Sequence, residues 1–510
     1  MAVYQSPGVY VKELPGGSKP IEGVGTAIAA FIGMTEKGPT GAATMISNWG
    51  DYTRTFGGFV GGYATPLAVY GYFDNGGGRA YIVRTNSDTS VPAPQALLPG
   101  GNPALKSLRA RAVDPAAQVS VDIGPASEAS DETFKLTVHG PAGATEEFDN
   151  VTLKKGKGNV LTEVKTRSKL ITLEEVSTEG SLVERRPADG AYQLAASDAA
   201  PAEVETSAFS GDVAARTGVA GLEAIEEVTM VLTPDVMPMQ AMGAISMDQA
   251  IGIQLALVSH AERMGDRVAI LDAPPGLGAQ EVFDWRRDQL KVDSSYATLY
   301  YPWIKVIDPL SRQPVFMPPS GYMAGIWGRN DDTRGVHKAP ANESVRGALD
   351  VQLQLTSAEQ GLLNPAGINC VRVFPRGGVR VWGARTLAQV DPEFKYLNVR
   401  RLFNFIESSI MQGTQWSVFE PNDLILWAKL RRNTSSFLNR VWRDGALFGA
   451  TPDEAFYVKC DAETNPQEVI EAGQVVVEIG LAPVRPAEFV IFNIRQVAPG
   501  EGGGGGGAEA

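Results

Sequence analysis

The chain has 510 residues, of which 44% are hydrophobic and 20% charged, the balance of a globular protein long enough for about three domains. Lys and Arg number 45 against 58 Asp and Glu, and the resulting net charge of −13 argues against general nucleic-acid binding, which needs a net basic face. The only cysteines, Cys370 and Cys460, argue against a disulfide framework. The N-terminus lacks a signal-peptide pattern, and no apolar run approaches about 18 residues, so we expect a soluble protein made in the cytoplasm.

The first 90 residues predict an extended arm followed by the start of an α/β domain. Three prolines within residues 1–20 disfavour a helix there. The run TAIAAFIG (residues 26–33) is typical of a buried strand, and AYIVRT (residues 80–85) of a second one, with a helix expected between them. We therefore expect an N-terminal arm over 1–20 and the first part of an α/β domain over 21–90.

Residues 91–215 differ in composition from the rest of the chain. They contain no Trp, and short strand-like runs such as FKLTVHG and LITLEEV alternate with turns. The alternation of apolar and polar residues disfavours disorder. The pattern predicts a small β-rich module, inserted into the α/β domain and exposed on its outside.

Strands that alternate with helices return after Gly221. EVTMVLTPD, VAILDAPPG and YATLYYPWIKV are typical of strands, and residues 239–263 have the periodicity of a helix. Such alternation predicts a largely parallel sheet. The expected fold class is multidomain α/β, with a discontinuous α/β domain that resumes over 216–365.

The remaining residues predict an α+β domain and a terminal strand. We expect a C-terminal domain over 366–487 with helices at 396–411 and 424–443. A strand over 488–497 is apolar on both faces and follows prolines that keep it extended. A Gly-rich segment, 498–510, has no large apolar residue and is expected to be flexible.

No pattern of catalytic, metal-binding or cofactor-binding residues stands out. The three histidines, His139, His260 and His337, lack the spacing of a zinc site. A Ser-His-Asp triad could be assembled from Asp235 or Asp248, His260 and Ser344, but Ser344 lies in ANESVRG rather than in a Gly-flanked nucleophile turn. Gly276-Leu277-Gly278 has the position of a dinucleotide loop, yet Glu281 replaces its third glycine. We expect no catalytic residue, metal or cofactor.

Two charged stretches deserve separate interpretations. RNDDTRGVHKAPAN (residues 329–342) gathers Arg, Asp, His and Lys without a nucleophile, so we interpret it as a loop held by internal ion pairs. Residues 424–443 contain five basic residues and no acid. On a helix, one face is apolar and the opposite face carries the basic stripe, defined here as Lys429, Arg432, Arg440 and Arg443. The stripe is either a solvated face or a docking surface for an acidic partner, and the missing acids favour docking.

The sequence resembles contractile tail sheath proteins of phages and of related phage-tail-like injection systems. The resemblance rests on stretches found in the expected order across residues 1–85 and 220–497: SPGVYVKE, PIEGVGTAIAAFIG, FDNGGGRAYIVR, PPSGYMAGIWGRNDDTRGVHKAPAN, RVWGARTL, YLNVRRLFNFIESSI, FEPND, AFYVKCD and PVRPAEFVIFNIRQ. Residues 91–215 carry no such resemblance.

The resemblance implies a structural protein that is not an enzyme. A sheath protein forms a helical homopolymer around an inner tail tube, is joined by baseplate and terminal cap proteins, and contracts to drive the tube through a target envelope. It binds no nucleic acid and does not itself insert into a membrane. The family's central domain is subtilisin-like in fold without being a protease.

The resemblance also assigns roles to particular residues. The basic stripe corresponds to the family's tube-facing helix. Arms at both ends of a sheath chain add strands to neighbouring subunits, and the matching residues here are Val9, Tyr10, Val11, Phe489, Val490, Ile491, Phe492 and Ile494. Two alternatives are a divergent subtilisin-like serine hydrolase and a non-contractile coat or fibre protein.

Overall fold

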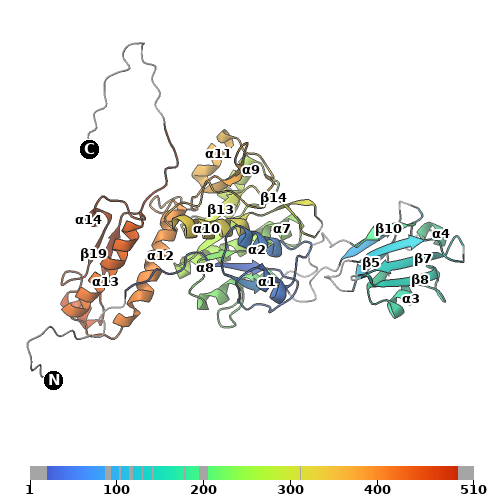
Figure 1. Cartoon of the computed structure of the whole chain (residues 1–510), viewed down its shortest axis with the longest axis horizontal. Coiled ribbons are helices and arrows are strands. Elements are labelled where there is room, and N and C mark those ends of the chain that lie inside the picture. Colours follow the sequence, from blue (N-terminus) through green and yellow to red (C-terminus); the bar gives the residue numbers. More distant parts are fainter. Residues whose placement is uncertain are drawn as a thin grey trace, which may run out of the picture.

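The computed structural model describes residues 20–86, 94–102, 105–113, 119–128, 130–140, 143–176, 180–194, 205–310 and 312–491. It consists of three bodies arranged along one long axis (Figure 1). A β-rich module lies at one end, an α/β domain in the middle, and a helical domain with a small sheet at the other end.

The middle body is built on one eight-stranded sheet with the order β18-β17-β13-β12-β11-β1-β3-β2. Six strands run parallel: β1 (Ala29–Gly33), β3 (Ala80–Arg84), β11 (Met230–Leu232), β12 (Val268–Asp272), β13 (Ala297–Tyr301) and β17 (Ile368–Phe374). The edge strands β2 (Thr44–Ile46) and β18 (Gly378–Val381) are antiparallel. Strand β1 pairs with both β3 and β11, so segments before and after the β-rich module are neighbours in one sheet.

Helices cover both faces of this sheet, which is why its central strands are apolar on both sides. Ala30 and Ile32 of β1 pack into one core, and Ala29 and Phe31 into the other. The first core is covered by α7 (Val236–Ala241), α8 (Met247–Met264), α9 (Ala279–Trp285) and α11 (Ser357–Leu363). The second is covered by α1 (Trp49–Phe56), α2 (Thr65–Asp74), α10 (Ser320–Arg334) and a small sheet of β14 (Ile304–Ile307), β15 (Pro314–Met317) and β16 (Asp350–Val351).

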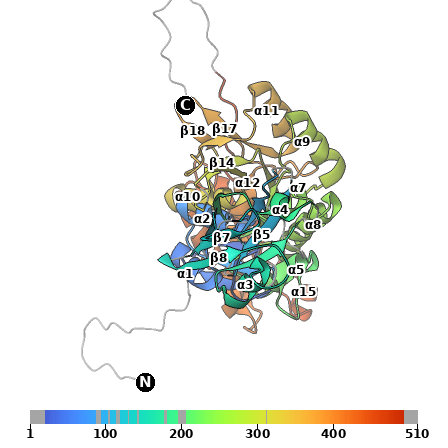
Figure 2. The same ribbon diagram turned by 90° about the vertical axis from the view of Figure 1, so that its right-hand side faces the viewer.

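The β-rich module has a core of its own, drawn entirely from residues 98–194. One sheet has the order β10-β6-β7-β8 and the other β4-β5-β9. The elements are β4 (Gln95–Pro99), β5 (Lys106–Ala112), β6 (Ser120–Gly124), β7 (Phe134–His139), β8 (Thr145–Val151), α3 (Val160–Arg167), β9 (Ile171–Glu175), α4 (Leu182–Arg185) and β10 (Gly190–Gln193). Viewed along the long axis, the module stands in front of the middle body (Figure 2).

The third body is a helical hairpin with a two-stranded sheet. Helices α12 (Leu397–Thr414) and α13 (Leu424–Arg443) pack together with α14 (Pro452–Ala455) and β19 (Phe456–Lys459). Among the described residues, β19 pairs only with β20 (Glu478–Leu481), and α15 (Gln467–Glu471) lies between them in sequence. The helix expected over 424–443 is confirmed: α13 spans those residues, and Asp423 caps it by accepting hydrogen bonds from the amides of Ile425 and Leu426.

Three boundaries differ from those expected. The central sheet continues through Val381, past residue 366, because β17 pairs with β13. Residues 207–215 were assigned to the inserted module, yet Phe209 of α5 (Ser207–Ser210) is buried in the middle body. Ile21, assigned to the α/β domain, is buried against α12 and α13. Strand pairing and helix docking join residues that are distant in sequence, so local patterns gave no signal for any of the three.

The strand expected over 488–497 is described only in its first part. Residues 488–491 belong to no strand in the isolated chain. Phe492 and Ile494, like Val9, Tyr10 and Val11, lie outside the described residues. Over the described part of the chain, every helix is too short or too polar to span a membrane.

Candidate interaction surfaces

Helix α13 has one apolar face and one charged face, as its sequence predicts. The apolar face is buried: Leu426, Trp427, Leu430, Phe437, Leu438 and Val441. Arg432 and Arg443 are exposed on the other face, and Lys429 is half-buried there. Among the residues that the structure describes, none pairs with these three cations. The helix therefore presents positive charge that the described part of the chain does not neutralise.

Arg440, the fourth residue of the basic stripe, has a partner within the chain. Its guanidinium donates a hydrogen bond to the carbonyl of Ile21 and lies 5.9 Å from the ring centroid of Phe437. Arg440 thus holds the segment that enters from the N-terminal arm against α13. The structure gives Arg440 a role in anchoring that segment, which the sequence did not suggest.

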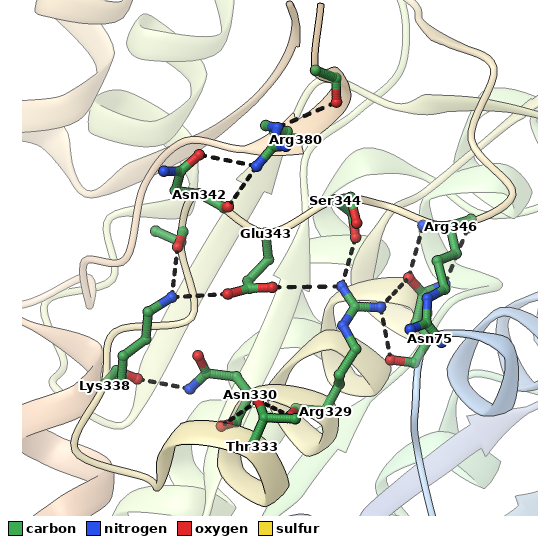
Figure 3. Close-up of polar contacts among 12 residues, drawn as sticks. Asn75, Arg329, Asn330, Thr333, Lys338, Asn342, Glu343, Ser344, Arg346 and Arg380 are labelled. Atoms are coloured by element: carbon green, nitrogen blue, oxygen red, sulfur yellow. Dashed lines mark hydrogen bonds and ion pairs between the residues drawn. The ribbon is translucent and has the colours of Figure 1, made fainter.

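The expectation of a loop over residues 329–342 held by internal ion pairs is only partly met. Residues 329–334 are the end of α10, and the ion pairs of Arg329 and Lys338 run to Glu343, just outside the stretch (Figure 3). Lys338 Nζ lies 2.9 Å from Glu343 Oε1, and Arg329 Nη2 lies 3.8 Å from Glu343 Oε2. Arg329 also donates to the carbonyl oxygens of Asn75 and Ser344, at 3.1 and 2.6 Å. The network ties α10 to the end of α2.

The residues that follow this loop cover the open edge of the central sheet. The amide of Asn342 donates to the carbonyl of Val381 at 2.8 Å, and the amide of Val381 donates to the carbonyl of Glu343 at 3.0 Å. Strand β18 therefore has no free edge at this point. An uncovered edge would be a template for unwanted pairing, so the charged loop has a structural role.

A buried ion pair joins the middle body to the C-terminal helices. Arg401 of α12 and Asp331 of α10 have side chains that are each 4% exposed, and they are joined by bonds of 2.6 and 3.0 Å. Thr26 donates its hydroxyl proton to Asp331 at 2.6 Å and accepts from Arg401 through its carbonyl at 3.0 Å. The Arg401 guanidinium also lies 4.7 Å from the centroid of the Trp327 ring. This joint connects three segments that are far apart in sequence.

Glu488, at the root of the C-terminal arm, is anchored to the middle body. Arg385 donates to its two carboxylate oxygens at 2.7 and 2.5 Å, Asn364 donates at 2.9 Å, and Tyr396 at 3.2 Å. Burial raises the pKa of Glu488, but the hydrogen bonds from Arg385 and Asn364 outweigh it, so the pKa lies below its usual value. The carboxylate is thus held in its charged form.

Beyond Glu488 the chain exposes three consecutive apolar side chains. Phe489, Val490 and Ile491 are 73%, 70% and 80% exposed. Phe489 and Val490 line a groove of about 1000 Å³, together with residues that include Arg334, Lys338 and Trp382. A free subunit therefore carries an apolar strand-like segment with no internal partner among the described residues.

The hypothetical catalytic residues do not assemble. Asp235 accepts hydrogen bonds from the amides of Met34, Ala64 and Thr65, and burial raises its pKa. His260 packs beside Arg267, and burial together with that cation lowers its pKa to about 3. No hydrogen bond links Asp235, His260 and Ser344 in the part of the chain that the structure describes.

The other candidate chemical sites are also accounted for structurally. The Glu281 carboxylate accepts from the amide of Gly278 at 2.7 Å, so it occupies the helix start where a pyrophosphate would bind. His139 lies 3.0 Å from Asp122, and His337 accepts through its carbonyl from Asn398. Among the described residues, His, Cys, Asp and Glu side chains form no group that could hold a metal ion.

Comparisons with known proteins place the chain in a family. A family model described as "Phage tail sheath protein central domain" matches residues 234–387, and one described as "Phage tail sheath C-terminal domain" matches residues 389–497. Their junction agrees with a central sheet that extends through Val381. The tail sheath protein of Burkholderia phage BcepMu is 24% identical, over 96% of this chain and 97% of its own length.

Other sheath proteins match over shorter stretches or in fold. The tail sheath proteins of Vibrio phage KVP40 and Salmonella phage ViI are 24% and 27% identical, and the chain spans only 41% and 35% of their lengths. The fold is similar to that of the contracted sheath of the extracellular contractile injection system PVC. The TM-score is 0.59 at 24% identity, and the match covers 99% of the PVC chain. The contracted helical sheath of the anti-feeding prophage gives the same TM-score and identity.

The mixed α/β fold and the order of its domains define the class of tail sheath proteins. The chain belongs to the phage tail sheath protein family, and it is a structural protein rather than an enzyme. The identification made from the sequence motifs is confirmed. The hydrolase alternative is set aside, because the relatives are sheath proteins.

The anchoring contacts were not found from the sequence. Arg385 and Glu488 are 103 residues apart, Arg401 and Asp331 are 70 apart, and Arg440 and Ile21 are 419 apart. Each pair joins segments whose proximity depends on the assembled fold. The quoted sheath-family motifs include each of these residues except Arg440, but they do not indicate the pairs.

Proposed function

We propose that this chain polymerises into a helical sheath around an inner tail tube and that contraction of the sheath drives the tube through a target envelope. The observation that carries the proposal is the match to the BcepMu tail sheath protein over nearly the full length of both chains. The fold shared with contracted sheaths of two injection systems supports it. Baseplate and cap proteins are the expected partners at the ends of the polymer, and assembly is expected in the cytoplasm.

The terminal arms are proposed to link neighbouring subunits by strand addition. A two-stranded sheet is marginally stable alone, and β19–β20 pairs with no further strand among the described residues. Its outer edges suit strands donated by a neighbour. The donors are Val9–Val11 and Phe489–Ile494; the described residues 489–491 are exposed and outside any strand of their own chain.

The basic stripe is proposed to face the inner tube. Lys429, Arg432 and Arg443 carry unpaired positive charge on a helix whose opposite face is packed. An acidic tube surface would complement it. The β-rich module lies at the far end of the long axis from α13 (Figure 1), so it would then project outward.

Finer assignments of the domains belong to the same proposal. We propose that the middle body is a subtilisin-like domain without catalytic function, supported by its parallel sheet with helices on both faces. The functional divisions are then the N-terminal arm, this discontinuous domain, the outer module, the C-terminal sheath domain and the C-terminal arm.

Electron microscopy of the assembled protein tests the function. When the chain is co-produced with its tube and baseplate proteins, we expect tubular sheaths in two states of different diameter, because contraction must repack the subunits. Filaments of a single fixed width under all triggering conditions would favour the non-contractile coat or fibre protein instead.

Deleting an arm tests the linkage. Removal of residues 1–14, or truncation before Glu488, is expected to give folded monomers that form no sheath, because the backbone pairing between subunits is lost. The substitution Ile491→Pro removes one backbone donor in the arm and should weaken assembly. Circular dichroism and sedimentation report folding and assembly separately. Normal sheaths from either deletion would rule out the arms as the linkage.

A further inference from the structure

The connection between α12 and α13 presents a compact set of exposed apolar side chains. Phe419 is fully exposed, and Val418, Leu424 and Ile425 are 63%, 71% and 65% exposed. These four residues, here named the hairpin tip, lie within eight consecutive positions. Large apolar residues gathered at such exposure mark a surface that a partner covers.

The segment that carries the hairpin tip is fixed by contacts to the body beneath it. Asn422 donates from its amide nitrogen to the carbonyl of Gln474 at 2.8 Å and accepts from the indole of Trp427 at 2.8 Å. Trp427 and Leu426 are buried beneath, against Cys460. A partner would therefore meet a preorganised surface and would not have to order a loop on binding.

Phe419 is also held in an unusual backbone conformation. Its φ of +68° lies in the left-handed region, which large side chains rarely adopt. Such strain persists where the surrounding structure imposes it, and it is concentrated at functional sites. Here its effect is to leave a large aromatic side chain fully in solvent.

The tip is continuous with the basic stripe. Ile425 precedes Lys429 by four positions and Arg432 by seven, so the three residues lie on one face of α13. Apolar side chains thus occupy the beginning of this face, and cations occupy the rest of it. The connection between α12 and α13 also carries two exposed acids, Glu420 and Asp423, and the Asp423 carboxylate caps the helix.

We propose that the hairpin tip inserts into the inner tube, in an apolar depression bordered by carboxylates. This inference rests on the proposed docking of α13 on the tube, and it adds the chemistry of the contact. Phe419 and Ile425 bury apolar surface, while Lys429 and Arg432 pair with acids at the border. The two parts differ in salt dependence, since exposed charges are screened over about 8 Å at 0.15 M salt whereas apolar contacts are not weakened by screening.

The test compares three variants of the full chain, each co-produced with the tube protein. The tip variant carries Phe419→Ser and Ile425→Ser. The stripe variant carries Lys429→Glu, Arg432→Glu and Arg443→Glu. The control carries Val390→Ser and Leu349→Ser, which remove two other exposed apolar side chains, 83% and 56% exposed, from outside the hairpin. Tube retained in pelleted sheaths is measured at 0.05, 0.15 and about 0.5 M salt, over the screening range of the charges.

We expect the tip variant to form sheaths. At high salt, where charge pairing is screened, it should retain at least about tenfold less tube than the control does. The stripe variant should lose tube most strongly at low salt, where its charges are least screened. Equal retention by tip variant and control at every salt concentration would overturn the inference and leave the docking of α13 intact. Normal tube loading in the stripe variant, with loss in the tip variant, would overturn the charge docking alone.

A failure of the tip variant to form sheaths, with the fold retained, would show that the tip contacts a second copy of this chain. That outcome also overturns the inference. All four tip residues are exposed, so their replacement leaves the core unchanged, and the thermal unfolding temperature of the monomer verifies this for each variant.

Discussion

Single ion pairs connect the bodies of this protein. Asp331 and Arg401 are almost fully buried, and each has a second partner in Thr26, so neither charge is left unsatisfied. Removing one member of a buried pair leaves the other charge without compensation, which costs about 3–5 kcal/mol. The joint therefore ties the middle body to the hairpin α12–α13.

The substitution Arg401→Met is expected to lower the free energy of unfolding by about 3 kcal/mol or more, because Asp331 loses its cation in a buried site. Urea unfolding followed by circular dichroism measures the change. The exposed pair between Arg287 and Asp284 is the matched control, and Arg287→Met should cost no more than about 1 kcal/mol. Equal effects of the two substitutions would contradict the role of the joint.

Glu488 makes the anchoring of the arm dependent on pH. Its pKa is lowered in the folded chain, so the unfolded state binds the proton more readily and stability rises with pH in this range. The contribution is fully present above the unfolded pKa of about 4.3 and is lost as the pH falls through the lower folded pKa. Unfolding measured from pH 7 to pH 3 should show the wild type converging on Glu488→Gln.

The control for Glu488 is Glu471→Gln, on a carboxylate at the end of α15. A change that both substitutions share would come from the loss of one acid and not from the contact with Arg385. If the difference between wild type and Glu488→Gln stays constant down to pH 3, the anchoring by Arg385 does not depend on the charge of Glu488.

At the scale of elements, α13 has one packed face and one charged face, and its residues have separable roles. Reversal of Lys429, Arg432 and Arg443 to Glu should leave the monomer folded, because none of them pairs within the described chain. At 0.05 M salt, this variant should co-assemble with much less tube than the wild type does. At higher salt the difference should be smaller, because the charges of both proteins are screened. Co-sedimentation with tube protein measures it.

Two further variants distinguish the possible causes of a loss of tube co-assembly. Arg440→Glu breaks the bond to the Ile21 carbonyl, so it should also lower the stability of the monomer, unlike the other three reversals. Reversal of Lys154, Lys155 and Lys157 in the β-rich module changes the net charge equally at the opposite end of the molecule. If that variant loses tube to the same extent, the effect is one of net charge.

For the whole molecule, the separate core of the β-rich module has a direct consequence. Its core is drawn from residues 98–194, and Phe209 already belongs to the middle body. Replacement of residues 94–194 by a short Gly/Ser linker should therefore leave a soluble, folded subunit. Replacement through residue 215 should be less stable, because it also removes Phe209. Thermal unfolding of the two variants distinguishes these outcomes, and inclusion bodies from both would show that the module completes the main fold.

Much of the fold could be predicted where the decisive signal is local. The structure confirms the helix expected over 424–443, because its apolar spacing repeats through the whole length. The buried strands β1, β3, β12 and β13 were recognised as short apolar runs. The assignment to the sheath family came from motifs spread along the chain, and the family models agree with it.

The positions of the domain boundaries and the anchors depended on tertiary structure. The run INCVRVF of β17 has strand character in any sheet, and only its pairing with β13 places it in the central one. Nothing in the sequence distinguishes Glu488 from the other acids, and its role follows from the contact with Arg385 in the folded chain. In the same way, the role of Ile21 follows from its burial against α12 and α13. The periodicity of a sequence indicates which side of a helix or strand is apolar. Which other element packs against that side depends on the free energies of all the contacts that the folded chain can make.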